Sequence, residues 1–391
     1  MISFRSQVGS LLFLVLIFLL NFLSRTILSP LMPTVEEELK IGHEEAGFLF
    51  FLISLGYCLM LLGSGLISSR FTHRRTIIFS SLAVGGALLI AGLSSNLWGI
   101  RFGFLLVGMA AGIYMPSGIA TITGLVSSRD WGKAMGVHEL APNLSFMAAP
   151  LIAEVLLRTY SWQGVLIVIG IASMASSGIF ACFGKGGDFR GEPPNARVIR
   201  SILTEPSFWI MIFFFALGVA GTLGVYSMIP LYLVSERGMD RTWVNTLFGL
   251  SRVLMIGGGL FAGWMTDRMG LKRTLKAVFL STGLVTALLG MASDSWIIIL
   301  IFIQPLLASC FFPAGFAALP RMGSARFKNV AVSFTIPFGY LLGGGAIPAG
   351  LGFIGEAGSF SLGFAILGSL FFGGFLMVRY LKLAPLESPH L

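Results

Sequence analysis

Two long apolar runs flank the stretch Gly263-Trp-Met-Thr-Asp-Arg-Met-Gly-Leu-Lys-Arg273, which ends the first of them. It holds two glycines, an Asp-Arg pair and a closing Lys-Arg pair. A weaker copy, Gly65-Leu-Ile-Ser-Ser-Arg-Phe-Thr-His-Arg-Arg75, begins 198 residues earlier in a chain of 391 residues. The copy keeps the leading glycine and the closing basic pair, but Ser69 stands where the Asp belongs. Two copies half a chain apart indicate a duplicated protein.

The composition is typical of a membrane protein. Hydrophobic residues make up 55% of the chain and charged residues 11%, which argues against a soluble globular domain. Apolar runs long enough to cross a bilayer recur along the whole sequence. The formal net charge is +9, but the basic residues lie in short loops between apolar runs, a pattern of membrane topology rather than of a nucleic-acid-binding face. We therefore expect contact with the lipid bilayer and none with nucleic acid.

The apolar runs predict twelve spans, each a helix, because backbone groups in hydrocarbon must be hydrogen-bonded within their own segment. The first run continues past Pro30 without a small-residue cleavage site, so it is interpreted as a span rather than a signal peptide. The predicted spans are 8–34, 45–68, 76–95, 99–126, 134–157, 162–183, 207–234, 242–266, 274–293, 296–320, 329–355 and 360–381.

Three more pairs of stretches repeat between the halves, at offsets of 197, 195 and 197 residues. A register held across separate matches is hard to obtain by chance, and it predicts two parallel bundles related by an axis along the membrane normal. The matching stretches are 114–120 with 311–317, 133–142 with 328–337, and 31–33 with 228–230.

With its degraded copy, the 263–273 stretch resembles the loop signature of the major facilitator superfamily, and the resemblance covers nearly the whole chain. It implies an all-α polytopic membrane protein with twelve transmembrane helices in two pseudo-symmetric six-helix bundles. The expected bundles are residues 1–184 and 207–391, with a polar cytoplasmic linker at 185–206. The resemblance also implies that the halves rock about a central cavity that binds a small solute.

Basic residues mark one side of the predicted topology. Most loop lysines and arginines fall on the side of the termini and the linker. The other side holds only Lys40, Arg101, Arg158, Arg237 and Arg241. Because cytoplasmic loops carry the basic excess, we expect both termini and the linker in the cytoplasm. The protein is expected to be a monomer in the inner or plasma membrane.

Two arginines, Arg25 and Arg252, are not explained by loops. Each lies eleven residues from an expected span end, Glu36 or Gly263, which is about 16 Å along a helix. A charge at that depth costs about 2.5–3.5 kcal/mol to insert on translocon scales, and no Asp or Glu is expected at the same depth. We predict that both line the cavity and bind one anion, since a guanidinium fork suits a carboxylate or phosphate. The alternative is pairing with a buried carboxylate.

The segment Asn21-Phe-Leu-Ser-Arg25, eight residues before Pro33, also resembles the first helix of the anion/cation symporter family. Arg25 matches that family's arginine, but Ser24 replaces its Asp. In the fourth span, Ala111 stands where the family has a Glu, and Phe104 where a basic residue is common. The resemblance therefore implies anion binding, while the missing carboxylates leave proton coupling open.

Other polar residues within spans are candidates for the cavity wall or the proton path. His138 and Glu139 form a titratable pair for proton coupling, with a helix-end polar cluster or gate contact as the alternative. Glu154 and Arg158, four residues apart, are expected to pair locally. The candidate wall residues, for which a helix–helix hydrogen bond is the alternative, are Asn21, Asn143, Tyr57, Tyr114, Gln304 and Tyr340.

The 263–273 stretch also predicts a gate. Asp267 is expected to meet the amino end of the fifth span near Lys133, where unpaired N–H groups attract a carboxylate. That contact would hold the cytoplasmic side closed. The other candidate gate residues are Gly263, Arg268, Gly270 and Arg273; marking of topology is the alternative for the basic ones.

The sequence thus predicts a secondary transporter of a small organic anion, such as a carboxylate or sugar acid, with a proton or another cation as the candidate coupling ion. One alternative is proton-driven efflux of hydrophobic compounds, which 35 phenylalanines would suit. Another is a transporter-like sensor without net transport. No nucleophile, metal cluster or phosphate loop stands out, and the three cysteines lack ligand spacing, so we expect no enzyme, metal or cofactor.

Reporter fusions test the orientation. Fusions at Leu391 and within residues 184–205 should both report a cytoplasmic position, because the basic loops lie on that side. A periplasmic signal from either fusion would contradict the twelve-span topology.

Overall fold

The computed structural model describes residues 4–191, 204–321 and 328–383, which are helical apart from turns, loops and one isolated bridge between Thr72 and Arg190. Twelve segments of the described chain are long and apolar enough to cross a membrane, from Gln7–Leu39 to Phe360–Tyr380. This confirms the predicted twelve-helix membrane fold. The predicted linker at 185–206 lies largely outside the described residues.

Several spans are built from two consecutive helices. In the first half the helices are α1 (Phe4–Thr26), α2 (Leu28–Leu39), α3 (His43–Arg70), α4 (His73–Leu93), α5 (Leu97–Gly112), α6 (Tyr114–Leu125), α7 (Trp131–His138), α8 (Leu140–Leu157) and α9 (Trp162–Phe183). In the second half they are α11 (Pro206–Val219), α12 (Val225–Leu231), α13 (Arg241–Ser251), α14 (Val253–Met269), α15 (Leu271–Met291), α16 (Asp294–Ser309), α17 (Phe311–Ala318), α18 (Lys328–Leu341), α19 (Ile347–Glu356) and α20 (Phe360–Met377).

Short segments of tighter or wider helix connect these elements. Turns of π-helix join α11 to α12 (Ala220–Gly224), follow α12 (Tyr232–Glu236) and join α18 to α19 (Leu342–Ala346). Short 3-10 turns lie at Ser128–Asp130, Leu319–Arg321 and Val378–Tyr380.

Prolines cause most of the breaks within spans. Helices α1 and α2 separate at Ile27, and similar breaks fall at Ile113, Glu139 and Cys310. Each break lies three residues before a proline. Proline has no N–H to donate and its ring clashes with the carbonyl one turn earlier, so the helical ladder is interrupted there. A fifth break, at Arg252, has no such proline.

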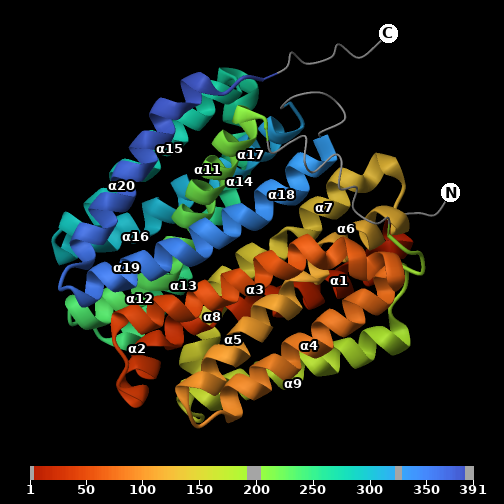
Figure 1. Cartoon of the computed structure of the whole chain (residues 1–391), viewed down its shortest axis with the longest axis horizontal. Coiled ribbons are helices and arrows are strands. Elements are labelled where there is room, and N and C mark those ends of the chain that lie inside the picture. The colour runs from red at the N-terminus through yellow and green to blue at the C-terminus, as the bar shows by residue number, and fades with distance from the viewer. Residues whose placement is uncertain (1–3, 192–203, 322–327, 384–391) are drawn as a thin grey trace.

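The helices run between two faces of the molecule. We call the end at which α1 begins and α20 ends the terminal face, and the opposite end the far face; both chain ends lie on one side in Figure 1. The connections at the far face are short, such as those between α2 and α3 and between α8 and α9. The cavity described below lies between these faces.

The two halves of the chain lie side by side and meet along matched helices. Figure 1 shows the first half in red to yellow-green and the second in green to blue. Across the seam α2 packs on α12, α3 on α18 and α19, and α8 on α13. Each of these seam helices thus meets a partner from the other half, as two similar bundles facing each other require.

Glycines bring α3 and α19 into close approach near the far face. A Cβ atom at Gly47 would lie 2.6 Å from the carbonyl oxygen of Pro348, and one at Gly345 would lie 2.7 Å from the Cβ atom of Ser54. Gaps this small admit only glycine, because a backbone atom or a Cβ atom cannot move aside as the end of a flexible side chain would. These contacts keep the halves together at this end.

A larger residue at Gly47 should wedge the far face open. We expect Gly47→Leu to raise the reactivity of a Ser54→Cys thiol with a membrane-impermeant reagent added from the far side. The matched control is Gly63→Leu on the same helix, where an added Cβ meets nothing within 4 Å. Equal reactivity in both variants would show that close packing at Gly47 does not hold this end closed.

Candidate functional site

A central cavity of about 300 Å³ lies between the two halves. Its wall is mostly aromatic and apolar, with few polar groups, the usual character of a small-molecule site. The first half contributes Arg25, Tyr57, Glu139 and Asn143 as its polar groups, and the second half contributes Thr222, Ser309 and Tyr340. The phenylalanines of the wall are Phe18, Phe22, Phe146, Phe215, Phe312 and Phe316.

Arg25 is the cation of this wall. It lies in the last turn of α1, two residues before the Ile27 break, and only 4% of its surface is exposed. Its guanidinium carbon lies 4.2 Å from the ring centre of Tyr57 and 4.6 Å from that of Phe22. Rings at these distances stabilise a cation through their negative faces, but no ion pair within the described residues joins Arg25 to a carboxylate. Its Nε also lacks a hydrogen-bond partner there.

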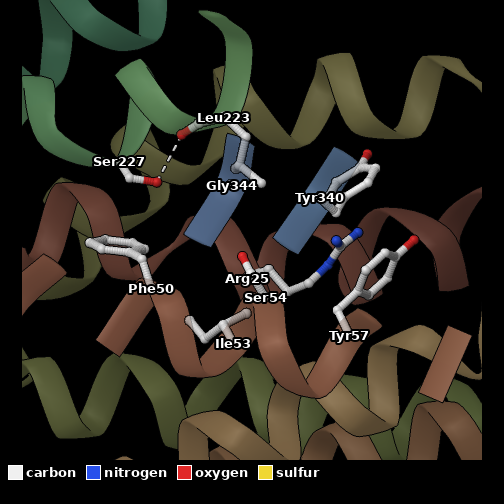
Figure 2. A pocket seen from close by; sticks show the side chains of 9 residues that line it. All are labelled: Arg25, Phe50, Ile53, Ser54, Tyr57, Leu223, Ser227, Tyr340 and Gly344. Atoms are coloured by element: carbon white, nitrogen blue, oxygen red, sulfur yellow. Dashed lines mark hydrogen bonds between the residues drawn. The ribbon is translucent and has the colours of Figure 1, made fainter. Parts of the chain in front are cut away.

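Two tyrosines continue this cluster across the seam. Tyr57 from α3 and Tyr340 from α18 have ring centres 5.0 Å apart, and the Arg25 guanidinium carbon lies 5.7 Å from the centre of the Tyr340 ring. Figure 2 shows the guanidinium beside the two rings. Beyond them lies a pocket of about 10 Å³, room for roughly one water molecule. Arg25 and the tyrosines line both spaces and therefore separate them.

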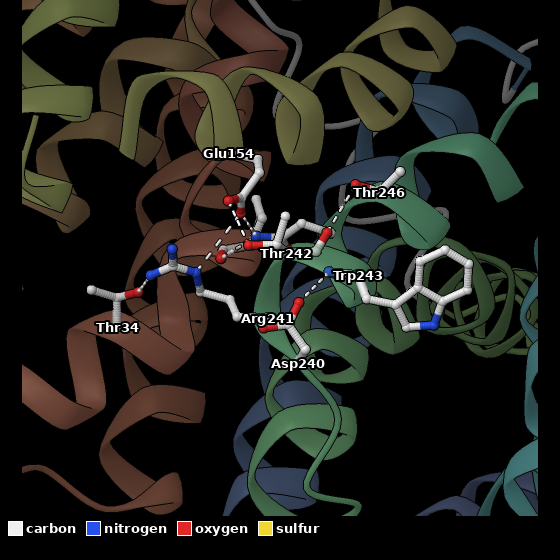
Figure 3. Close-up of polar contacts among 9 residues, drawn as sticks. Thr34, Glu154, Asp240, Arg241, Thr242, Trp243 and Thr246 are labelled. Atoms are coloured by element: carbon white, nitrogen blue, oxygen red, sulfur yellow. Dashed lines mark hydrogen bonds and ion pairs between the residues drawn. The ribbon is translucent and has the colours of Figure 1, made fainter. Parts of the chain in front are cut away.

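Glu154 helps to close the far face above this cluster (Figure 3). Its carboxylate, on α8 and 7% exposed, accepts hydrogen bonds of 2.8 Å from Thr242 and 3.3 Å from Asn245 on α13. Arg241 Nε lies 3.8 Å away, and Arg241 Nη1 donates to Thr34 of α2 at 3.1 Å. The predicted local pair with Arg158 is wrong, because Glu154 faces the opposite half.

A second contact at the far face also joins the halves. The His43 backbone N–H donates to Glu356 of α19 at 2.5 Å, while His43 Nδ1 lies 2.9 Å from Glu36. Towards the terminal face, by contrast, the cavity wall is exposed among the described residues: Glu139 has 48% of its side chain exposed and Phe316 has 45% of its surface exposed. The cavity is thus closed at the far face and open towards the terminal face.

Arg252 does not line the cavity. It lies at the break between α13 and α14, 1% exposed, with its guanidinium carbon 4.3 Å from the Phe248 ring centre and 5.0 Å from that of Tyr226. None of its three guanidinium nitrogens has a hydrogen-bond partner among the described residues. A single anion cannot reach both arginines in this conformation.

His138 is fully buried beside the cavity. Its ring stacks on Phe18 at 4.3 Å, and its Nε2 lies 3.1 Å from the hydroxyl of Tyr114. That hydroxyl donates to the Leu14 carbonyl at 3.0 Å. On the other side of the ring, Nδ1 lies 3.4 Å from a carboxylate oxygen of Glu139, which reaches the cavity.

The remaining predicted wall residues divide into two groups. Tyr57, Tyr340 and Asn143 line the cavity. Asn21 and Gln304 instead donate to backbone carbonyls of neighbouring helices, at 3.3 Å to Ala111 and 2.8 Å to Gly221, which was the alternative for them. Tyr114 is buried behind the wall and acts on His138 rather than on the cavity.

The predicted gate residues are apart in this conformation. Asp267 is exposed and makes no hydrogen bond or ion pair within the described part of the chain. Lys133 pairs with Asp130 at 3.0 Å, and Arg268 lies over the Trp264 ring. Gly270 has φ +80°, a conformation that favours glycine. Gly263 has open space beside it, and Arg273 is exposed.

Sequence reasoning missed the aromatic residues Phe22, Phe146 and Tyr226 and the Glu154 closure. Tyr226 lies within a span, as Tyr57, Tyr114 and Tyr340 do. A polar side chain within a span was the criterion that selected those three, so the same criterion could have selected Tyr226, which is as deeply buried as Tyr114. No local pattern indicates that Glu154 meets α13, since its partners are far away in the sequence.

Characterised relatives resemble this chain at low identity. A probable sulfoacetate transporter of Cupriavidus necator is 22% identical over 96% of this chain and 94% of its own length. The cis,cis-muconate transport protein of Acinetobacter baylyi is 22% identical over 94% of both chains. A multidrug efflux protein of Bacillus subtilis is 24% identical over 92% of this chain and 89% of its own.

Solved structures share the fold. A bacterial homologue of the human lysosomal transporter Spinster, in an inward-facing and unoccupied conformation, superposes with a TM-score of 0.77 at 14% identity, over 97% of this chain and 95% of that one. The family model of the Major Facilitator Superfamily matches residues 14–293. Since that match covers well over half of the sequence, this chain belongs to the major facilitator superfamily.

Proposed function

We propose that the protein is a secondary transporter that moves a small organic anion, a carboxylate or sugar acid, across the plasma membrane by alternating access. The observation that carries this proposal is Arg25, a guanidinium in the wall of the central cavity without a carboxylate partner among the described residues. In this proposal the terminal face is cytoplasmic, and residues 1–184 and 207–391 rock against each other about the linker.

The chemistry of Arg25 favours an anion over a neutral or cationic substrate. Three aromatic rings contact the guanidinium and hold it in place, so little side-chain freedom is lost when its N–H groups bind a carboxylate. An entering anion supplies the missing negative charge in a site where few waters screen it. A cation would instead be repelled at the same place.

The relatives support this class of substrate. Two of them are named for the organic anions sulfoacetate and muconate. The phenylalanine-rich wall and the efflux relative support the second candidate, export of hydrophobic compounds. We favour the anion because an apolar substrate would leave the positive charge of the buried Arg25 without a compensating negative charge.

The geometry around His138 supports proton coupling. The single hydroxyl hydrogen of Tyr114 goes to Leu14, so the hydrogen between Tyr114 and His138 must belong to Nε2. Nδ1 and the Glu139 carboxylate can then bond only through a further proton, held by one or the other. We propose that this pair carries the coupling proton and exchanges it with the cavity through Glu139.

The Asp267 gate belongs to the conformation that closes the terminal face. Asp267 and the amino end of α7 are not engaged here, and the cavity is open on that side. We propose that the contact forms when the halves rock to the other state. Rocking would then exchange the Asp267 contact for the Glu154 contact.

Arg25→Lys tests the anion site. We expect proteoliposomes to lose about ten- to a hundredfold of their uptake of radiolabelled carboxylates and sugar acids, because lysine keeps the charge but loses the fork. Uptake is measured with and without a pH gradient. The matched control is Arg101→Lys, which alters an arginine bonded to Glu45 outside the cavity. Normal anion uptake by Arg25→Lys, or a wild-type preference for neutral or cationic compounds, would reject the proposal.

Asp267→Asn tests the gate. We expect this variant to favour the state in which the terminal face is open, so thiol labelling in the cavity should rise from that side and fall from the far side. Asp188→Asn is the control, because Asp188 is exposed and pairs with Arg74 at 3.7 Å. Unchanged labelling on both sides would reduce Asp267 to a marker of topology.

A further inference from the structure

A charged side chain that has no hydrogen-bond partner among the described residues lies directly beneath the far-face closure. Arg252 forms the one span break described above that no proline explains. Its backbone N–H donates to the Gly249 carbonyl at 3.2 Å, and its carbonyl accepts from the Met255 N–H at 3.1 Å, each bond spanning three residues. Its three guanidinium nitrogens are unpartnered within the described chain and dry. A buried charge in this condition is strongly unfavourable, so a role in another state of the protein is needed to account for it.

Two aromatic side chains screen Arg252 from the cavity. Phe146 of α8 lines the cavity, and its ring centre lies 4.7 Å from that of Tyr226. Tyr226 lies behind it, fully buried, and donates to the Phe146 carbonyl at 3.4 Å. Arg252 lies beyond Tyr226. On the cavity side, the Phe146 ring contacts the ring of Phe22, and the Arg25 guanidinium lies over that Phe22 ring.

Helix α8 carries one side of both the screen and the closure, and α12 and α13 of the other half carry the opposite side. On α13, Asn245 precedes Arg252 by seven residues and lies about 10 Å nearer the far face. On α8, its partner Glu154 follows Phe146 by eight residues, about 12 Å nearer that face. Tyr226 lies on α12, which packs on α13, so movement of α8 away from both of these helices would break the Glu154 bonds and part Phe146 from Tyr226 together.

We infer that Arg252 is an anion-binding residue of the far-side-open state, masked by Phe146 and Tyr226 when that side closes. This rests on the proposed anion transport. An anion arriving from the far side meets Arg252 first, and closure then transfers it to Arg25. Because only the open state offers the Arg252 contact, the site binds anions more tightly from the far side than from the terminal side.

A pair of charged thiol reagents tests this without knowledge of the substrate. A single cysteine is placed at Phe146 in a protein whose own cysteines are replaced by serine, with Glu154→Gln to loosen the closure. We expect the anionic sulfonatoethyl methanethiosulfonate, added from the far side, to react at least about tenfold faster than the cationic trimethylammonium reagent, because the nearby guanidinium attracts one and repels the other.

Variants at Arg252 show whether this residue causes the faster reaction of the anionic reagent. The difference in rate should vanish in Arg252→Met, persist in Arg252→Lys, and persist in the control Arg101→Gln. Methionine fits a dry aromatic site, so Arg252→Met should melt at no lower temperature than the parent protein, whereas a purely structural arginine would lower it. Equal rates for the two reagents, or a preference that survives in Arg252→Met, would overturn the inference.

The outcomes separate this inference from the proposed function. If Arg25→Lys abolishes anion uptake but the reagents show no dependence on Arg252, the transporter proposal stands and the far-side site does not. If the dependence on Arg252 holds while organic anions are not transported, the site exists and the proposed substrate class is wrong.

Discussion

An arginine buried at bilayer depth, with no carboxylate partner among the described residues, is the constraint on which the rest of this structure depends. Arg25 persists there because Phe22, Tyr57 and Tyr340 face its guanidinium and because it borders a cavity. Tyr57 and Tyr340 come from opposite halves, so the cluster around the charge also forms part of the seam. A substitution at Arg25 therefore alters contacts with both halves.

The seam shows how binding can be linked to movement. Near the far face, glycine contacts between α3 and α19 and the Glu154 bonds between α8 and α13 hold the halves together. Towards the terminal face the cavity wall is exposed and Asp267 is unengaged. A ligand shifts such an equilibrium only by its difference in affinity for the two states. Two arginines exposed in different states would provide that difference.

The fold was predictable because its signals are local. Span length and apolar composition predict twelve helices, and the breaks at Ile27 and Cys310 follow from prolines three residues later. The site was predictable only in part. A charge within an apolar run locates Arg25, but whether Asn21 or Asn143 faces the cavity depends on helix rotation, which packing sets. The local spacing rule paired Glu154 with Arg158, since sequence spacing carries no information about the opposite half.

Ligand stabilisation of the purified protein tests the central claim most directly. The melting temperature is measured with a series of small carboxylates and with their uncharged amides, in the wild type and in Arg25→Lys. We predict that at least one carboxylate raises the melting temperature of the wild type, that its amide does not, and that the rise is lost in Arg25→Lys. Equal stabilisation by the amide, or a rise that persists in Arg25→Lys, would contradict an anion site built on Arg25.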